Sequence, residues 1–260
     1  MEEQRTILVI NPNSSESITK ALEDALRPVC SPTTRLTFLT GPSASPPSIN
    51  DAVTSIQSAQ AVFTSGAGSA RSFSDDTEIR RAHRAVLVCC FSNHPLAGMI
   101  RQACPGVPAL HILDTAVSAA LACSSGAPFG ILTTGRAMVS DIDQGVLQYL
   151  GGASTRYAGC VPTDLGVLEL QDREPSVREK VHRVIREKAA LLAQRNAGAI
   201  ILGCAGMAGM EELVRSGVAD AIGQEAASKV AIIDGAKAGV QLLDGLSRCN
   251  FYGTSPRTNA

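Results

Sequence analysis

The sequence has no tryptophan, only three tyrosines and six phenylalanines, and no surplus of either charge. Its 23 basic residues face 24 acidic ones, for a formal net charge of −1. A nucleic-acid partner needs a basic surface for phosphates and aromatic rings for bases, so this composition argues against one. No run approaches the roughly 20 apolar residues that cross a bilayer, so we expect no membrane partner.

Targeting and metal-binding signals are also missing. Residues 1–5 lack the basic, apolar and small-residue order of a signal peptide, so we expect a cytoplasmic protein. The eight cysteines form no Cys-x-x-Cys pair and no Cys/His ligand spacing, which argues against a structural zinc site. With 45% hydrophobic and 18% charged residues over 260 positions, the chain can bury a core and is not disordered.

Short apolar runs alternate with helical patterns along the chain. The predicted strands are 6–10, 36–39, 61–65, 85–90, 108–113, 130–133, 199–202 and 230–233. The predicted helices are 17–26, 50–60, 95–103, 115–123, 139–150, 177–194, 211–216 and 236–246. This alternation predicts an α/β fold with parallel strands, in which ligands bind at the carboxyl ends of the strands.

The pattern is also doubled. A strand that ends in Asn-Pro-Asn at Asn11 opens the first half, and one that ends in Thr-Thr-Gly at Thr133 opens the second. A strand ending in Cys90 follows the first, and a strand ending in Cys204 follows the second. We therefore predict two related α/β lobes about a pseudo-twofold axis, comprising residues 1–113 with 231–260 and residues 114–230.

Cys90 and Cys204 are the residues most suited to carry chemistry. Each follows an apolar strand and precedes a turn, where free backbone N–H groups lower a thiol pKa and hold an anion. The structural alternatives are a buried core thiol for Cys90 and a tight glycine turn around Cys204. A pseudo-twofold axis would bring both thiols to one cleft. Two thiols on opposite sides of a carbon can remove a proton from one face and return it to the other, which is racemisation without a cofactor.

Other polar residues at strand ends have a functional and a structural interpretation. The segment from Asn11 suits a carboxylate or imide oxygen, or is an ordinary helix N-cap, and Thr133-Thr134 has the same two interpretations. His94 either assists the first thiol or caps the helix that follows it. His111, inside a predicted strand, is either an assisting residue or a satisfied core histidine.

Eight short motifs follow one another along the chain in an order that is characteristic when they are taken together. They are Asn-Pro-Asn-Ser-Ser from Asn11, Thr-Gly-Pro from Thr40, Ser48-Ile49, Cys-Phe-Ser from Cys90, Thr-Thr-Gly-Arg from Thr133, Leu-Gly-Val-Leu-Glu-Leu from Leu165, Leu-Gly-Cys-Ala-Gly-Met from Leu202 and Ile-Asp-Gly from Ile233. Together they span nearly the whole chain, which resembles the Asp/Glu/hydantoin racemase superfamily, in particular its hydantoin and allantoin racemase branch with fungal relatives.

The resemblance implies two Rossmann-like lobes with the active site between them, no metal or other cofactor, a small-molecule substrate and a homo-oligomer. It implies that Cys90, which directly precedes the Phe of its motif, is one catalytic base rather than Cys89, and that Cys204 is the other. It assigns further positions to substrate binding: Asn11, Ser65, Gly66, Phe91, Ser92, Thr133, Thr134, Ala205 and Gly206.

One segment departs from the family pattern. Where the family has a Gly-Ile-x-Glu-Ala segment, this chain has His111 in place of the glycine and Asp114 in place of the glutamate. The resemblance favours a cofactor-independent racemase or epimerase of 5-substituted hydantoins or allantoin. Two alternatives stay open: an isomerase or decarboxylase that uses the same cysteine pair in a specialised pathway, and a non-catalytic ligand-binding protein on this scaffold.

Overall fold

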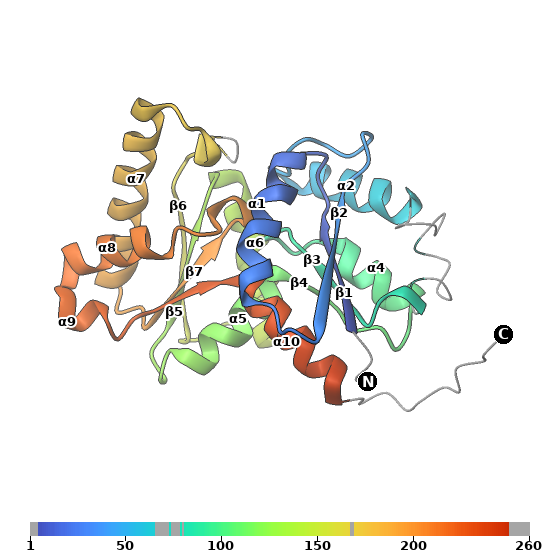
Figure 1. Cartoon of the computed structure of the whole chain (residues 1–260). Coiled ribbons are helices and arrows are strands. Elements are labelled where there is room, and N and C mark those ends of the chain that lie inside the picture. The colour runs from blue at the N-terminus through green and yellow to red at the C-terminus, as the bar shows by residue number, and fades with distance from the viewer. Residues whose placement is uncertain (1–4, 66–72, 74–78, 80, 167–168, 250–260) are drawn as a thin grey trace.

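A computed structural model describes residues 5–65, 73, 79, 81–166 and 169–249 (Figure 1). In this part of the chain, two parallel four-stranded sheets have the orders β2-β1-β3-β4 and β6-β5-β7-β8. The strands of the first are β1 (Arg5–Asn11), β2 (Thr34–Thr40), β3 (Ala85–Val88) and β4 (Ala109–His111). Those of the second are β5 (Phe129–Thr133), β6 (Tyr157–Pro162), β7 (Ala199–Gly203) and β8 (Ala231–Asp234). The second order repeats the first, which confirms the predicted α/β fold class.

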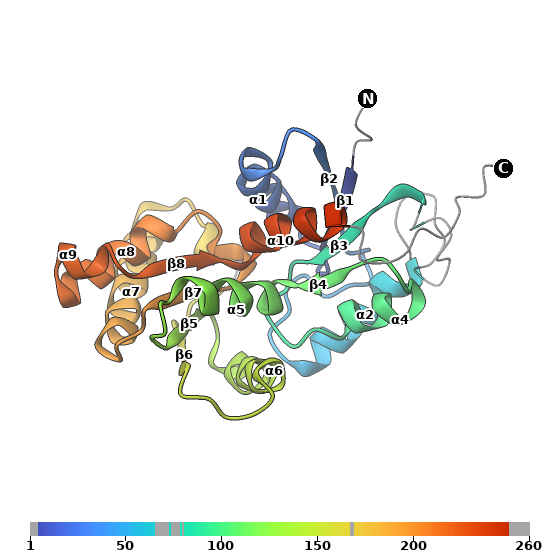
Figure 2. The same cartoon turned by 90° about the horizontal axis from the view of Figure 1, so that it is seen from below.

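Helices cover both faces of each sheet (Figures 1 and 2). The outer face of the first sheet carries α2 (Ala52–Ser65) and α4 (Pro95–Ala103), and that of the second carries α7 (Pro175–Gln194) and α8 (Glu211–Ile222). Between the sheets lie α1 (Glu16–Leu26), α5 (Ile112–Cys123), α6 (Val139–Leu150) and α10 (Gly235–Cys249). Shorter elements are α9 (Gln224–Ala227) and the 3₁₀ turns η1 (Arg27–Val29), η2 (Arg136–Met138), η3 (Glu169–Gln171) and η4 (Ala205–Met207).

Alternation of side chains along each strand divides the core into three parts. In β1, Ile7 and Val9 pack in a central core with the helices between the sheets, whereas Leu8 and Ile10 pack under α2 and α4. In β7, Ile201 joins the same central core, and its neighbours pack under α7 and α8. The central strands β1, β3, β5 and β7 are therefore buried on both faces, which explains why they are continuous apolar runs in the sequence.

The predicted strand at residues 61–65 is wrong, because these residues are the end of α2. Ser55, Ser58, Ala59 and Val62 are buried at helical spacing, so the apolar run belongs to the buried stripe of a helix. Periodicity in so short a run does not separate a buried strand from a buried helix.

Strand β6 was missed by the sequence analysis. It forms the edge of the second sheet beside β5, and most of its side chains are only half-buried. An edge strand of this kind lacks the continuous apolar run that identifies the central strands.

The C-terminal segment contributes to both sheets. β8 pairs with β7 in the second sheet, whereas the sequence prediction groups residues 231–260 with the first lobe. α10 then returns to the centre, where Val240 and Leu243 join the central core and a Cβ on Gly239 would lie 2.6 Å from Leu87. The division of the chain into two lobes stays a prediction. Within the described residues, no helix combines the length and hydrophobicity needed to cross a bilayer.

Candidate functional site

A cleft lies where the carboxyl ends of the central strands of both sheets meet. It brings together seven residues that the sequence analysis selected: Cys90, Phe91, Thr133, Thr134, Cys204, Ala205 and Gly206. The rest of its lining is formed by Asn13, Ile18, Ser48, Ile49, Cys89, Met138 and Gly203. This position agrees with the general rule for ligand sites in open parallel sheets.

Cys90 lies in the turn that follows β3. The backbone N–H of Cys89 still bonds to the carbonyl oxygen of Ile10 on β1, at 2.7 Å, and this bond fixes the start of the turn. Two residues later, the Ser92 hydroxyl lies 3.3 Å from the Cys90 Sγ. Burial raises the pKa of Cys90 to about 12; the Ser92 hydroxyl opposes this rise, and negative charge on Cys204 adds to it. Both thiols belong to residues that line the same cleft.

Cys204 occupies the equivalent position after β7. It is the N-cap of η4, and its Sγ accepts a hydrogen bond from the N–H of Gly206 at 3.3 Å. Burial raises the pKa of Cys204 to about 11, while the Gly206 N–H, the Thr134 hydroxyl and the Met207 N–H lower it. Cys204 therefore ionises more readily than Cys90, because it has more donors for its negative form.

The glycine before Cys204 is required by packing. A Cβ on Gly203 would lie 2.7 Å from the Ile131 side chain and 2.8 Å from the carbonyl oxygen of Leu132. Only a glycine lets β7 approach β5 this closely, so one of the small residues around Cys204 has a structural role. The same strand end thus provides both the close packing of β7 against β5 and the hydrogen-bond donors around the Cys204 thiol.

Asn11 does not line the cleft, whereas Asn13 does. The Asn11 side chain is almost fully buried, and its amide nitrogen donates to the Asn13 Oδ1, the Ser15 carbonyl oxygen and the Thr19 hydroxyl at 2.9 to 3.0 Å. Asn11 thus organises the loop after β1. A Cβ on Gly41 would lie 2.5 Å from the Pro12 carbonyl oxygen. The loop after β2 therefore packs directly against the loop after β1.

The two histidines that we considered as assisting residues both cap helices and do not line the cleft. His94 accepts the Leu96 N–H at its Nδ1 and contacts the Ser58 hydroxyl through its Nε2, at 2.9 Å. Burial lowers the pKa of His94 to about 3, so it is neutral at physiological pH.

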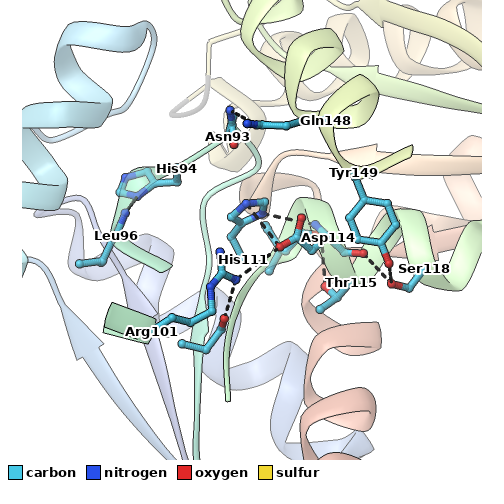
Figure 3. Close-up of polar contacts among 12 residues, drawn as sticks. Asn93, His94, Leu96, Arg101, His111, Asp114, Thr115, Ser118, Gln148 and Tyr149 are labelled. Carbon is cyan, nitrogen blue, oxygen red and sulfur yellow. Dashed lines mark hydrogen bonds and ion pairs between the residues drawn. The ribbon is translucent and has the colours of Figure 1, made fainter. Parts of the chain in front are cut away.

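His111 has the same kind of role at the start of α5. Its Nδ1 accepts the N–H of Asp114, and its Nε2 lies 3.5 Å from the Asp114 carboxylate (Figure 3). Burial lowers the pKa of His111. The segment that departs from the family pattern therefore caps α5 and does not reach the lining of the cleft.

Two further predicted positions, Ser65 and Ser92, are not among the described lining residues. Ser65 ends α2, where its hydroxyl donates to the carbonyl oxygen of Val62. Ser92 is fully buried, and its hydroxyl contacts the Sγ of Cys90, which does line the cleft. Gly66 lies outside the described residues.

Several lining residues were not selected from the sequence. Asn13, Ser48 and Ile49 belong to the motifs that carry the resemblance, so the signal for them was present. Ile18 and Met138 come from α1 and η2, and nothing in the sequence marks these apolar residues as different from core residues. In the part of the chain that the structure describes, no cluster of three or more His, Cys, Asp or Glu side chains is placed to hold a metal ion.

Comparison with known proteins agrees with the fold and the strand-end motifs. The family model for Asp/Glu/hydantoin racemases matches residues 7–243. An uncharacterised protein of Schizosaccharomyces pombe is 32% identical over 252 residues, covering 95% of this chain and 93% of that one. A hydantoin racemase of Rhizobium meliloti is 29% identical, covering 98% of this chain and 93% of that one.

Among solved structures, an allantoin racemase from Klebsiella pneumoniae superposes with a TM-score of 0.75. Its sequence is 26% identical, and the match covers 96% of this chain and 90% of that one. The family model alone spans most of the chain, and the relatives cover it almost from end to end. The chain therefore belongs to the Asp/Glu/hydantoin racemase family and is a racemase-type enzyme.

Proposed function

We propose that the protein racemises 5-substituted hydantoins, allantoin included, by passing a proton between Cys90 and Cys204 without a cofactor. The observation that carries this proposal is the position of the two thiols. They follow equivalent strands of two sheets with the same strand order, and both line one cleft. A pair placed in this way suits the removal of a proton from one face of a carbon and its return to the other.

The lining of the cleft supports a neutral ring as the substrate. Its polar side chains are the amide of Asn13 and the hydroxyls of Ser48, Thr133 and Thr134, and none of its described residues is Lys, Arg, His, Asp or Glu. Amides and hydroxyls match the N–H and C=O groups of an imide ring. A free amino acid would bring a carboxylate and an ammonium to a cleft whose described residues offer no oppositely charged side chain, which disfavours it as the substrate.

The reaction balances with the two thiols alone. The thiolate of one cysteine takes the proton from the ring carbon, and the electron pair of the broken C–H bond moves into the adjacent carbonyl to form an enolate. Asn13 and Ser48 stabilise the enolate oxygen, because Asn11, which the resemblance assigns to substrate binding, does not line the cleft. The opposite thiol then donates its proton to the other face of the carbon and becomes the thiolate. The negative charge has moved from one sulfur to the other, so the next turnover runs in the reverse direction.

The raised pKa of each thiol fits this chemistry. A thiolate in the cleft is a stronger base than a free thiolate, since burial raises the pKa of Cys90 to about 12 and of Cys204 to about 11. A stronger base suits a carbon acid, provided that the partner thiol is still protonated. Because Cys204 is the more acidic of the two, it carries the negative charge first.

Proton exchange in deuterated water tests the proposal. Single enantiomers of allantoin and of 5-alkyl and 5-benzyl hydantoins are followed by NMR and optical rotation with wild type, Cys90→Ser, Cys204→Ser and, as a control, Cys123→Ser. Cys123 is exposed and outside the cleft, so its variant should match wild type. Deuterium uptake with loss of rotation, absent in both cleft variants, supports a two-thiol racemase.

Other results would point elsewhere. Racemisation at the wild-type rate by Cys204→Ser would end the two-thiol mechanism. Release of CO2 from a malonate-type substrate without racemisation of hydantoins would favour the decarboxylase alternative. Assembly into a homo-oligomer and location in the cytoplasm stay predictions, for which size-exclusion chromatography with light scattering and cell fractionation are the direct measurements.

A further inference from the structure

Helix α6, which follows β5 of the second sheet, holds the turn that carries Cys90. Cys90 follows β3 of the first sheet, whereas α6 follows β5 of the second. The Asp141 carboxylate in the first turn of α6 accepts the backbone N–H of Asn93 at 2.9 Å. At the other end of α6, the Gln148 Oε1 accepts the side-chain amide of Asn93 at 3.0 Å (Figure 3). Both contacts act on a residue three positions after Cys90.

The packing of α6 permits this close approach. Gly145 lies between Asp141 and Gln148 on the helix and is buried. A Cβ there would lie 3.3 Å from the Asn93 Cβ and 3.2 Å from a Leu113 methyl, tighter than ordinary contact. The missing side chain therefore lets the helix lie directly against the turn.

The contacts on Asn93 join the two halves of the site. We propose that Asp141, assisted by Gln148, is a positioning residue that fixes the Cys90 turn at a set distance from Cys204. Removing a proton and returning it across one carbon requires both sulfurs to stay within reach of the same atom, and small displacements of such groups are expensive. The proposal rests on the proposed function for its catalytic part and on geometry alone for its structural part.

Asp141 also acts on Cys90 through its charge. Burial is the main cause of the raised pKa of Cys90, and the negative charges of Cys204 and Asp141 add to the rise. Cys89 is the neighbouring titratable group in the chain, and its own pKa is raised well above the ordinary value by burial. Replacing Asp141 by Asn removes the charge but keeps a carbonyl oxygen for the Asn93 N–H, whereas Ala removes both. The two variants therefore separate charge from position.

The test compares Asp141→Ala, Asp141→Asn and Gln148→Ala with Asp143→Asn as a matched control. Asp143 is another carboxylate on α6, and it accepts the Tyr157 hydroxyl instead of a group in the turn. Two readouts are taken: kcat and KM for hydantoin proton exchange, and the separate iodoacetamide alkylation rates of Cys90 and Cys204 measured by peptide mass spectrometry.

We expect Asp141→Ala to lower kcat by at least about tenfold with little change in KM, and Asp141→Asn to restore most of it. Alkylation of Cys90 should accelerate in Asp141→Ala while that of Cys204 is unchanged. In Asp141→Asn, the rise of Cys90 alkylation with pH should shift to lower pH, because the opposing charge is gone. Asp143→Asn should match wild type in both readouts.

The opposite results overturn the proposal. They are an unchanged Cys90 rate in Asp141→Ala, or an equal acceleration at both cysteines with a lower melting temperature, which would mean general loosening. If Asp141→Ala does not fold, Gln148→Ala, at an exposed position, carries the test: faster alkylation of Cys90 alone supports the proposal, and unchanged alkylation refutes it. If wild type exchanges no hydantoin, the proposed function fails, and the alkylation rates still decide whether α6 positions the turn.

Discussion

The environment of the two cleft thiols predicts how they react with an electrophile. An ordinary cysteine has a pKa of 9.0, whereas burial raises the pKa of Cys90 to about 12 and of Cys204 to about 11. Each step of one in pKa lowers the thiolate fraction at neutral pH tenfold. At pH 7, Cys90 should therefore hold about a thousandfold less thiolate than a free thiol, and Cys204 about a hundredfold less.

The assay is iodoacetamide labelling of the wild-type protein at several pH values, with N-acetylcysteine in the same tube as the reference thiol. Peptide mass spectrometry gives the rate at each cysteine separately. The rates at Cys90 and Cys204 should rise about tenfold per pH unit from pH 7 to 10, with Cys204 ahead of Cys90. Both rates should still be rising at pH 10, where the rate of the reference thiol has levelled off.

A different pH dependence would refute this reasoning. If either thiol reaches its maximal rate below pH 9, burial does not govern its ionisation, and the N–H and hydroxyl donors around it outweigh the loss of water. If Cys90 reacts faster than Cys204, the donors of Gly206 and Thr134 do not favour ionisation of Cys204 as the contacts imply.

Three further predictions concern stability. His94→Asn keeps a helix-capping residue but removes a group whose pKa falls to about 3 on folding. The free energy of unfolding of wild type is highest above about pH 6.5 and decreases as the pH falls, because the buried imidazole resists protonation. Urea denaturation should therefore show that the variant loses about 2 kcal/mol less unfolding free energy than wild type between pH 7 and 4.5. Gly217→Ala places a Cβ 2.4 Å from the Arg186 carbonyl oxygen and should cost about 1–3 kcal/mol in the same assay, and an unchanged midpoint would contradict that close approach. Leu87→Ala leaves a cavity in the central core beneath α10 and should cost about 2–5 kcal/mol by urea denaturation, with a smaller loss meaning that α10 settles into the space.

Much of the fold and of the cleft could be predicted from the sequence because the relevant signals are local. Cys90 and Cys204 come directly after buried apolar runs, and parallel strands place their carboxyl ends at the same edge of a sheet. The positions of both thiols on one cleft follow from that rule and from the doubled pattern.

The choice between Asn11 and Asn13 could not be predicted in this way. Both belong to the same short motif, and only the hydrogen bonds of the folded loop determine that the first is used internally while the second faces the cleft. The role of Asp141 was hidden for a similar reason, because its partner Asn93 is distant in sequence and belongs to the other sheet's turn. Contacts between the Cys90 turn and α6 depend on how α6 packs in the folded protein, and no local sequence pattern predicts this packing.

The position of α10 has a consequence for how the chain is made. This helix comes from the last described residues, yet it covers the inner face of the first sheet and contacts α1, α5 and β3. Its Asp244 also accepts the Thr34 hydroxyl at the start of β2. During synthesis, the first sheet is complete long before this covering helix leaves the ribosome, so the nascent chain must carry an exposed apolar face until α10 has emerged. Truncation before α10 should therefore yield chains that aggregate, rather than a smaller folded unit.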